Sequence, residues 1–245
     1  MVKERWLKAE LHSHCSLDPE DYKICEYSPE TLITEAARLG YEVLAITCHN
    51  LDIWNRELAD FAEGAGITLV PGMEVTVERK YHTLAYNFQA RSENLDSFEK
   101  LRARSREDTL VVAPHPFFPT LTCLGRNLER NLDIYDAVEC SGFYLPSADF
   151  NRPARRLASS KGKPLVGNGD VHFLWQLGKT FTWIYAEPDV TSILKAVKQG
   201  HVRLETSPLS HLNVVRWWAD ALWRYVFPVN RAPQGTVGPA VPDSL

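Results

Sequence analysis

Short apolar runs alternate with stretches of helical pattern along residues 8–199 of this 245-residue chain. Such alternation favours a parallel α/β sheet whose strands are joined by helices. About seven or eight strands in a chain of this length are most economically arranged as a closed barrel, with an open doubly wound sheet as the alternative. No G-x-G-x-x-G follows the first expected strand, which argues against a dinucleotide-binding sheet.

The apolar runs and the residues that flank them predict the individual elements. The expected strands are residues 8–14, 42–47, 67–75, 81–88, 109–115, 136–141, 164–170 and 181–186. The expected helices are residues 28–40, 54–66, 93–104, 124–132, 149–161, 189–199 and 211–227. Ser28 suits the N-cap of the first helix and Pro29 suits its first turn. The last helix carries aromatic residues at helical spacing, so we expect its tryptophan face to pack on the barrel; a helix for a partner or a membrane surface is the alternative.

Composition narrows the class of protein and its surroundings. Residues 1–227 are expected to form one domain, and residues 228–245, rich in Pro and Gly, a flexible tail. A net charge of −4 gives no global basic field, so nucleic acid is a possible but not a favoured partner. The first ten residues lack the apolar core of a signal peptide, and no apolar run is long enough to span a membrane. Five scattered cysteines without a C-x-x-C pair favour a cytoplasmic protein.

Ionisable residues collect at the ends of the expected strands. His12 and His14 end the first strand two residues apart, so both side chains point to one face. Further strand ends carry His49, Glu74, His115, Asp170 and His172. The C-terminal ends of barrel strands usually carry the chemistry, because the loops that follow them build the pocket. One such histidine is more typical of a hydrogen-bonded core residue, but five strand ends together predict a metal site.

The residue types indicate which metals such a site binds. Imidazole and carboxylate ligands without thiolates suit Mn, Zn or Fe. The candidates exceed what one tetrahedral ion needs, so we expect two or three divalent transition metals that share carboxylates. Such clusters activate a water molecule and stabilise an oxyanion, which is the apparatus of phosphoester hydrolysis.

The motif series resembles the PHP (polymerase and histidinol phosphatase) domain over residues 8–208. The resemblance lies in H-x-H on the first strand, the histidine of AITCHN, the glutamate of PGMEV, the histidine of APHP and D-x-H in GNGDVH. It implies a distorted (β/α)7 barrel of the PHP type, a trinuclear metal site and phosphoesterase activity on a small phosphate ester or nucleotide.

The resemblance also implies how the ligands divide among three ions. His12, His14, Glu74 and Asp170 would hold the first ion. Glu74 would bridge to a second ion, joined by His82 and His115. Asp18, His49 and His172 would hold the third ion, and Asp21 is the alternative to Asp18.

Two features separate this chain from the usual family pattern. The family reads T-D-H-N or T-D-H-D where this chain has Thr47-Cys48-His49-Asn50. Cys48 is not expected to be a ligand, and the missing aspartate would loosen His49. Asp18 follows His14 by four residues, where the family usually places its carboxylate five residues on.

The expected substrate is a small phosphorylated molecule hydrolysed by a metal-activated water, and no residue stands out as the general acid. Arg126 and Arg152 are the favoured substrate-binding cations, because they follow expected strands near the pocket. A PHP-like metal-binding module without catalysis and a metal-dependent amidohydrolase are the alternatives. An amidohydrolase would want a lysine at the end of a central strand, and none is found there.

Overall fold

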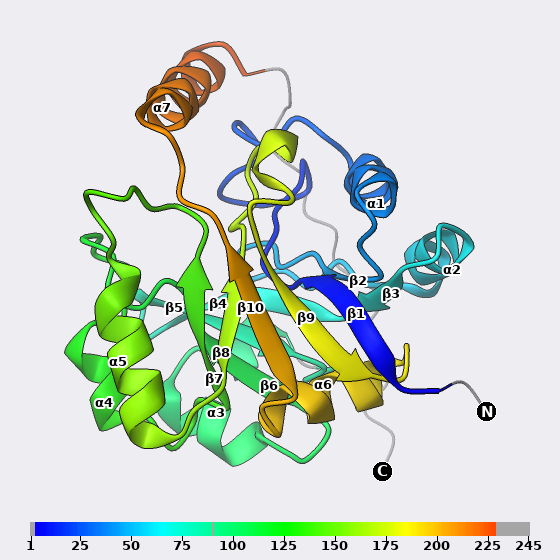
Figure 1. Ribbon diagram of the computed structural model, residues 1–245, viewed down its shortest axis with the longest axis vertical. Helices are drawn as coiled ribbons and strands as arrows, with labels where there is room; N and C mark the ends of the chain where they lie inside the picture. Colours follow the sequence, from blue (N-terminus) through cyan, green and yellow to red (C-terminus); the bar gives the residue numbers. More distant parts are fainter. Residues whose placement is uncertain (1–2, 90, 229–245) are drawn as a thin grey trace.

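The computed structural model describes residues 3–89 and 91–228 as ten strands, seven α-helices and two short 3-10 helices (Figure 1). The predicted flexible tail, residues 228–245, lies outside the described residues except for Pro228. The single domain expected over residues 1–227 stays a prediction.

The first sheet has the strand order β10-β9-β1-β2-β3. Its strands are β1 (Arg5–Glu10), β2 (Val43–Ala45), β3 (Thr68–Val70), β9 (Thr180–Ala186) and β10 (Val202–Thr206). The pairs β1–β2 and β2–β3 are parallel, whereas β9 pairs antiparallel with both β1 and β10.

The second sheet has the strand order β4-β5-β6-β7-β8. Its strands are β4 (Gly72–Val77), β5 (Tyr81–Tyr86), β6 (Leu110–Ala113), β7 (Ala137–Ser141) and β8 (Leu165–Asn168). The pairs β4–β5 and β5–β6 are antiparallel, and the pairs β6–β7 and β7–β8 are parallel.

The structure is therefore a mixed α/β fold with two sheets, and the expected distorted (β/α)7 barrel of the PHP type is not confirmed. The expected strand 67–75 splits at Pro71 into β3 and β4, because proline has no N–H to donate to a ladder. β5 returns antiparallel to β4 through a turn in which Glu78 and Arg79 both have positive φ. β10 was not predicted. In the described chain, only isolated bridges link the sheets, Ser13 with Val171 and His49 with Glu74, so the ladder of named strands does not close.

Helices cover the outer faces of the two sheets and one end of the space between them. The helices α1 (Pro29–Arg38) and α2 (Arg56–Gly64) pack against the first sheet near β2 and β3 (Figure 1). The outer face of the second sheet is covered by α3 (Phe98–Arg104), α4 (Arg126–Arg130) and α5 (Asn151–Lys161). Leu84 and Tyr86 face Leu7 and Val43 across the inner core, which α6 (Val190–Lys198) joins. Ser28 caps α1 as predicted, accepting a hydrogen bond from the backbone N–H of Thr31.

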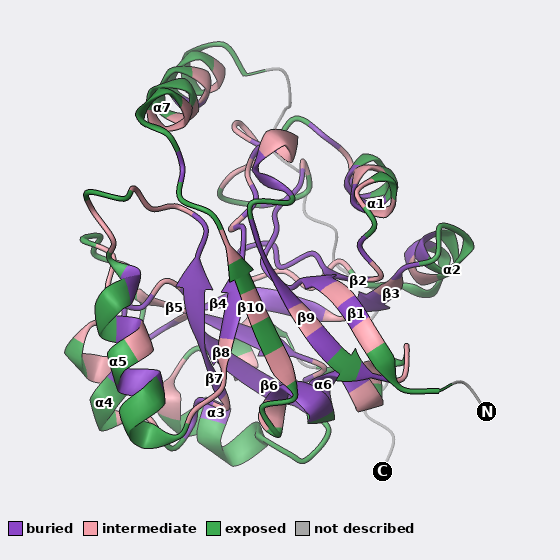
Figure 2. Cartoon of the chain, in the orientation of Figure 1, coloured by how far each residue is buried: buried purple, intermediate pink, exposed green. Residues whose placement is uncertain are grey.

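The last helix, α7 (His211–Val226), stands apart from both sheets beyond their upper ends (Figure 1). Trp217 contacts Phe143 and Phe173, but Trp218 and Trp223 are 62% and 66% exposed, so only part of the predicted tryptophan face packs on the rest of the domain. The opposite face is open, since Leu212 and Leu222 are 76% and 66% exposed (Figure 2). Among the described residues, no helix is both long and apolar enough to span a membrane.

Candidate metal centre

The strand ends place the predicted ligands around one point between the two sheets. His12 and His14 follow β1, His49 follows β2, and His115 follows β6. Backbone hydrogen bonds fasten these segments to one another: the N–H of His14 donates to the carbonyl of Val171, and the N–H of Asn50 donates to that of Glu74. The two sheets therefore meet at the ligand-bearing segments.

Glu74 is the centre of the cluster, because both of its carboxylate oxygens face histidines. Its Oε1 lies 2.8 Å from Nδ1 of His82 and 3.3 Å from Nε2 of His115. Its Oε2 lies 3.1 Å from Nε2 of His12 and 3.3 Å from Nε2 of His49. A carboxylate with ligand nitrogens on both oxygens is suited to bridge two cations.

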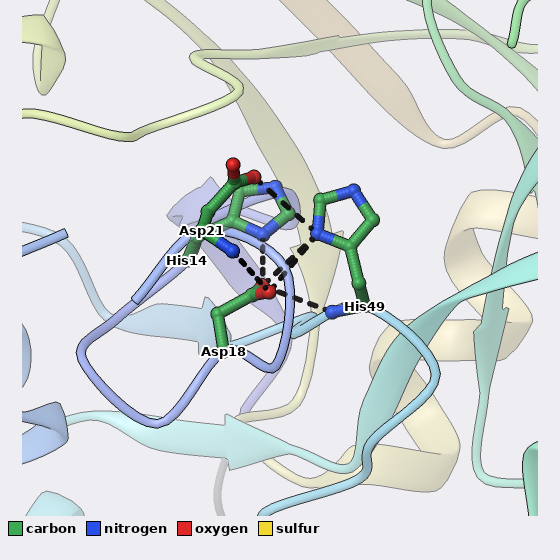
Figure 3. A group of neighbouring side chains, drawn as sticks. All are labelled: His14, Asp18, Asp21 and His49. Carbon is green, nitrogen blue, oxygen red and sulfur yellow. Dashed lines mark hydrogen bonds and ion pairs between the residues drawn. The ribbon is translucent and has the colours of Figure 1, made fainter. Parts of the chain in front are cut away.

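Asp18 and Asp21 both reach the cluster from the loop after β1 (Figure 3). Oδ2 of Asp18 lies 2.8 Å from Nδ1 of His14 and also accepts the backbone N–H of His49. Its Oδ1 accepts the backbone N–H groups of Glu20 and Asp21. Asp21 instead places Oδ2 3.0 Å from Nε2 of His172 and 3.4 Å from Nδ1 of His49. The structure thus brings both candidate aspartates to the cluster.

Asp170 closes the opposite side of the cluster. Its Oδ1 lies 3.5 Å from Nε2 of His12, 3.4 Å from Nε2 of His14 and 3.5 Å from Nδ1 of His172. Asp170 and His115 have φ values of 49° and 28°, in the left-handed region that non-glycine residues seldom occupy. Strained backbone at two facing side chains of this kind is typical of a functional site.

All nine predicted ligands fall within groups whose ligand atoms lie within 4.8 Å of one another, and Asp21 joins them. The predicted nine are His12, His14, Asp18, His49, Glu74, His82, His115, Asp170 and His172. Most are buried, so the cluster concentrates charge in a region of low dielectric. That arrangement is costly unless the charges compensate one another or bind cations.

The facing charges dominate the protonation of these groups. Burial alone would lower the pKa of His49, but Glu74 and Asp18 raise it to about 10. Burial likewise opposes ionisation of Glu74, yet the surrounding histidines, led by His82 and His12, hold its pKa well below the usual range. Without a metal, His49 therefore carries positive charge that a divalent cation would otherwise supply.

One buried nitrogen tests whether the residues fit a metal. Among the described residues, Nε2 of His14 finds no hydrogen-bond partner, although His14 is fully buried. It lies 3.5 Å from Oε2 of Glu74 and 3.4 Å from Oδ1 of Asp170. An imidazole nitrogen that is buried between two carboxylates and makes no hydrogen bond is suited to coordinate a metal ion. The residues present therefore fit divalent metals.

Two buried glutamates next to the cluster, Glu139 and Glu10, were not predicted from the sequence. Oε1 of Glu139 lies 3.0 Å from Nδ1 of His12, and its Oε2 accepts the backbone N–H of His115 at 2.6 Å. Glu10 accepts the backbone N–H groups of His12 and Gly169, and burial raises its pKa to about 8. A glutamate inside the apolar strand DAVECS was the signal that could have revealed Glu139.

The remaining predicted residues lie outside the cluster. Cys48 is buried with Sγ 3.6 Å from Sγ of Cys15, and it belongs to none of the potential ligand groups. Arg126 is exposed, and Arg152 is exposed with Asp149 as its ion-pair partner. Neither arginine lines the cavity that opens onto the predicted ligands, so the role of Arg126 and Arg152 as substrate-binding residues stays a prediction.

That cavity has a volume of about 270 Å³. Glu74, Asp170 and the rings of His49, His82, His115 and His172 form part of its wall. Phe118, Phe143, Trp217 and Trp218 form another part, and Thr120, Thr122 and Ser141 contribute hydroxyls. The candidate centre is therefore open to a small molecule.

Comparisons with known proteins agree with this arrangement. A family model described as PHP-associated matches residues 148–202. Over 149 residues the chain is 28% identical to the uncharacterized protein MJ1587 of Methanocaldococcus jannaschii, covering 56% of this chain and 83% of that relative.

Two solved structures share the fold. PsfC from Pseudomonas syringae PB-5123 aligns with a TM-score of 0.60 and 18% identity over 91% of this chain and 99% of its own. A candidate metal-dependent phosphoesterase from Bifidobacterium adolescentis aligns with a TM-score of 0.52 and 14% identity over 78% of this chain and 94% of its own. The PHP-associated segment and the motif series gathered around Glu74 support assignment of the chain to the PHP family.

Proposed function

We propose that the protein is a metal-dependent hydrolase that cleaves small phosphate esters at a site for up to three divalent transition metals. The observation that carries the proposal is the cluster of six histidines and four carboxylates around Glu74, which opens into a cavity. The name of the Bifidobacterium neighbour supports the same class of reaction.

The ten residues form five overlapping potential ligand groups: His12, His14 and Glu74; His12, His115 and Asp170; His14, Asp170 and His172; His49, Glu74 and His82; and His14, Asp18, Asp21 and His49. The division of these residues among three ions that the family resemblance implies stays part of the proposal. The four carboxylates of the cluster carry fewer negative charges than the six positive charges of three divalent cations. A site that holds three ions would therefore favour an anionic substrate such as a phosphate ester.

Bound divalent ions would act as Lewis acids that lower the pKa of water and neutralise negative charge on phosphorus-bound oxygens. The chain itself contributes the orientation of the ligands. Glu139 fixes the ring of His12, and Asp18 fixes that of His14. Thr120, Thr122 and Ser141 offer hydroxyls on the cavity wall that can hydrogen-bond a phosphate or its alcohol.

The test combines metal content with hydrolysis. Protein purified without chelators or a metal-binding tag is expected to hold two or three Mn, Zn or Fe per chain by plasma mass spectrometry, and to release phosphate from simple monoesters. The His12→Ala/Glu74→Gln variant should lose both properties. His201→Ala is the matched control, because His201 is exposed and belongs to no ligand group.

Two outcomes would separate the rival functions. Metal binding without hydrolysis of any ester or amide would leave a metal-binding module. Hydrolysis of amides but not of phosphate esters would make the protein a metal-dependent amidohydrolase.

A further inference from the structure

The part of the cavity wall that faces away from the ligands is aromatic and carries no cation. Among the described residues that line the cavity, none is lysine or arginine. Lysine and arginine side chains usually bind the second anionic group of a small phosphorylated metabolite. A cavity wall without these side chains therefore favours a substrate that has no second anionic group.

Arginines near the cavity form ion pairs with residues outside it. Arg216 pairs with Asp220 and lies over the ring of Trp175, and Arg224 pairs with Glu26. Arg155 pairs with Asp149. In the described structure these contacts direct the guanidinium groups into other parts of the surface, where Arg216 and Arg224 line a separate cavity.

The aromatic wall begins at the metal ligands themselves. The ring centroid of Trp217 lies 6.1 Å from that of His172 at 75° and 5.3 Å from that of Phe143 at 62°. On the other side, Phe118 lies 6.4 Å from His115 at 76°. These near-perpendicular contacts leave ring faces and edges available to a further flat group, and such pairs add to the free energy of apolar burial.

Trp217 is held in this position by α7. Its ring also contacts Phe173 at 86°, and Trp218 follows at the rim of the cavity. The helix thus brings an aromatic side chain from the end of the described chain against His172, a predicted ligand. The position of Trp217 explains why one face of α7 turns toward the domain while the other stays exposed.

We propose that the site selects phosphate monoesters whose alcohol is a flat, apolar ring, held against Trp217 and Phe143. The inference rests on the proposed phosphoester hydrolysis, with the phosphate at the metal ligands and the ring against the aromatic wall. Esters with a second phosphate or another anionic group are expected to bind more weakly, because no lysine or arginine among the described lining residues pairs with that charge.

Calorimetry with phosphonates tests the selectivity independently of turnover, since their P–C bond is not hydrolysed as an ester. Metal-loaded protein should bind benzylphosphonate about tenfold more tightly than methylphosphonate, with cyclohexylmethylphosphonate in between because it is apolar but not flat. In the Trp217→Leu variant the preference for benzylphosphonate should fall to about threefold or less. Phe143→Leu should reduce it in the same direction, although Phe143 lies outside α7 and only contacts it through Trp217.

The control is Trp223→Leu, on the same helix but 66% exposed and outside the cavity. It should keep the full preference, which separates ring contact from a general effect on α7. The inference would be overturned if benzylphosphonate and methylphosphonate bound equally, or if none of the three phosphonates bound. An unchanged preference for benzylphosphonate in Trp217→Leu would also overturn it.

Binding and hydrolysis measured together distinguish failure of this inference from failure of the proposed function. If simple phosphate esters are hydrolysed but show no preference for ring-bearing alcohols, the function stands and the selectivity is wrong. If benzylphosphonate is preferred but no phosphate ester is hydrolysed, the ring site stands and the proposed hydrolysis is wrong.

Discussion

Glu139 accepts a hydrogen bond from Nδ1 of His12 at 3.0 Å, which fixes the ring so that Nε2 points toward Glu74. The same carboxylate accepts the backbone N–H of His115 at 2.6 Å and the side-chain amide of Asn168 at 2.8 Å. One buried glutamate on β7 therefore orients ligands that come from two other strands.

Glu139→Gln is expected to weaken metal binding by about 10–100-fold, because an amide cannot replace the carboxylate in all three contacts. Titration with Mn or Zn followed by calorimetry measures the effect. Glu129→Gln, at an exposed position on α4, is the control and should leave the affinity unchanged. Equal affinity in the two variants would show that Glu139 does not position the ligands.

Asp18→Asn is expected to lower both stability and metal binding, whereas Asp21→Asn is expected to lower mainly metal binding. Asp18 is fully buried and accepts three backbone N–H groups, so its replacement should cost about 2–4 kcal/mol of stability as well as metal binding. Asp21 lines the cavity, so Asp21→Asn should lower the number of bound ions at a smaller cost in stability. Melting temperature without metal and metal content per chain separate the two effects. An equal loss of stability in both variants would contradict this division of roles.

Gly169→Ala is expected to destabilise the fold by about 1–3 kcal/mol. A Cβ at this position would lie 2.6 Å from Cγ2 of Val171 and 3.0 Å from Oε2 of Glu10, next to the predicted ligand Asp170. Gly64→Ala is the control, because a Cβ there meets nothing within 4 Å and the residue ends α2. Urea unfolding of both variants measures the difference, and an equally small effect would mean that the segment adjusts freely.

Asp52→Asn is expected to change how stability depends on pH. Burial raises the pKa of Asp52 to about 6, from about 4 in an unfolded chain. As pH rises from 4 to 6, the unfolded state ionises first, so this carboxyl progressively lowers the free energy of unfolding and the loss is complete above pH 6. The variant should therefore gain stability relative to the natural chain across that range and keep the gain at pH 8. Denaturant unfolding at pH 4, 6 and 8 tests this, and a constant difference would show that the group does not titrate as described.

The sequence determined the elements and the chemistry of the site. Alternation of apolar and helical segments gave nearly all the strands and helices, because burial on one face imposes a period that the residues display directly. Histidines and carboxylates at strand ends indicated metal ligands, because few other residue types bind Mn, Zn or Fe. In the structure the nine predicted ligands lie close together.

Only the tertiary structure decided the sheet arrangement and the surroundings of the ligands. Nothing local requires β9 to run antiparallel to β1, since that pairing depends on residues more than 170 positions apart in sequence. Glu139 and Trp217 acquire their roles in the same way. Glu139 can orient a predicted ligand only because the fold places it against His12. Trp217 can line the cavity only because the fold places α7 beside His172. Residue type sets which contacts are possible, but long-range packing selects which of them form.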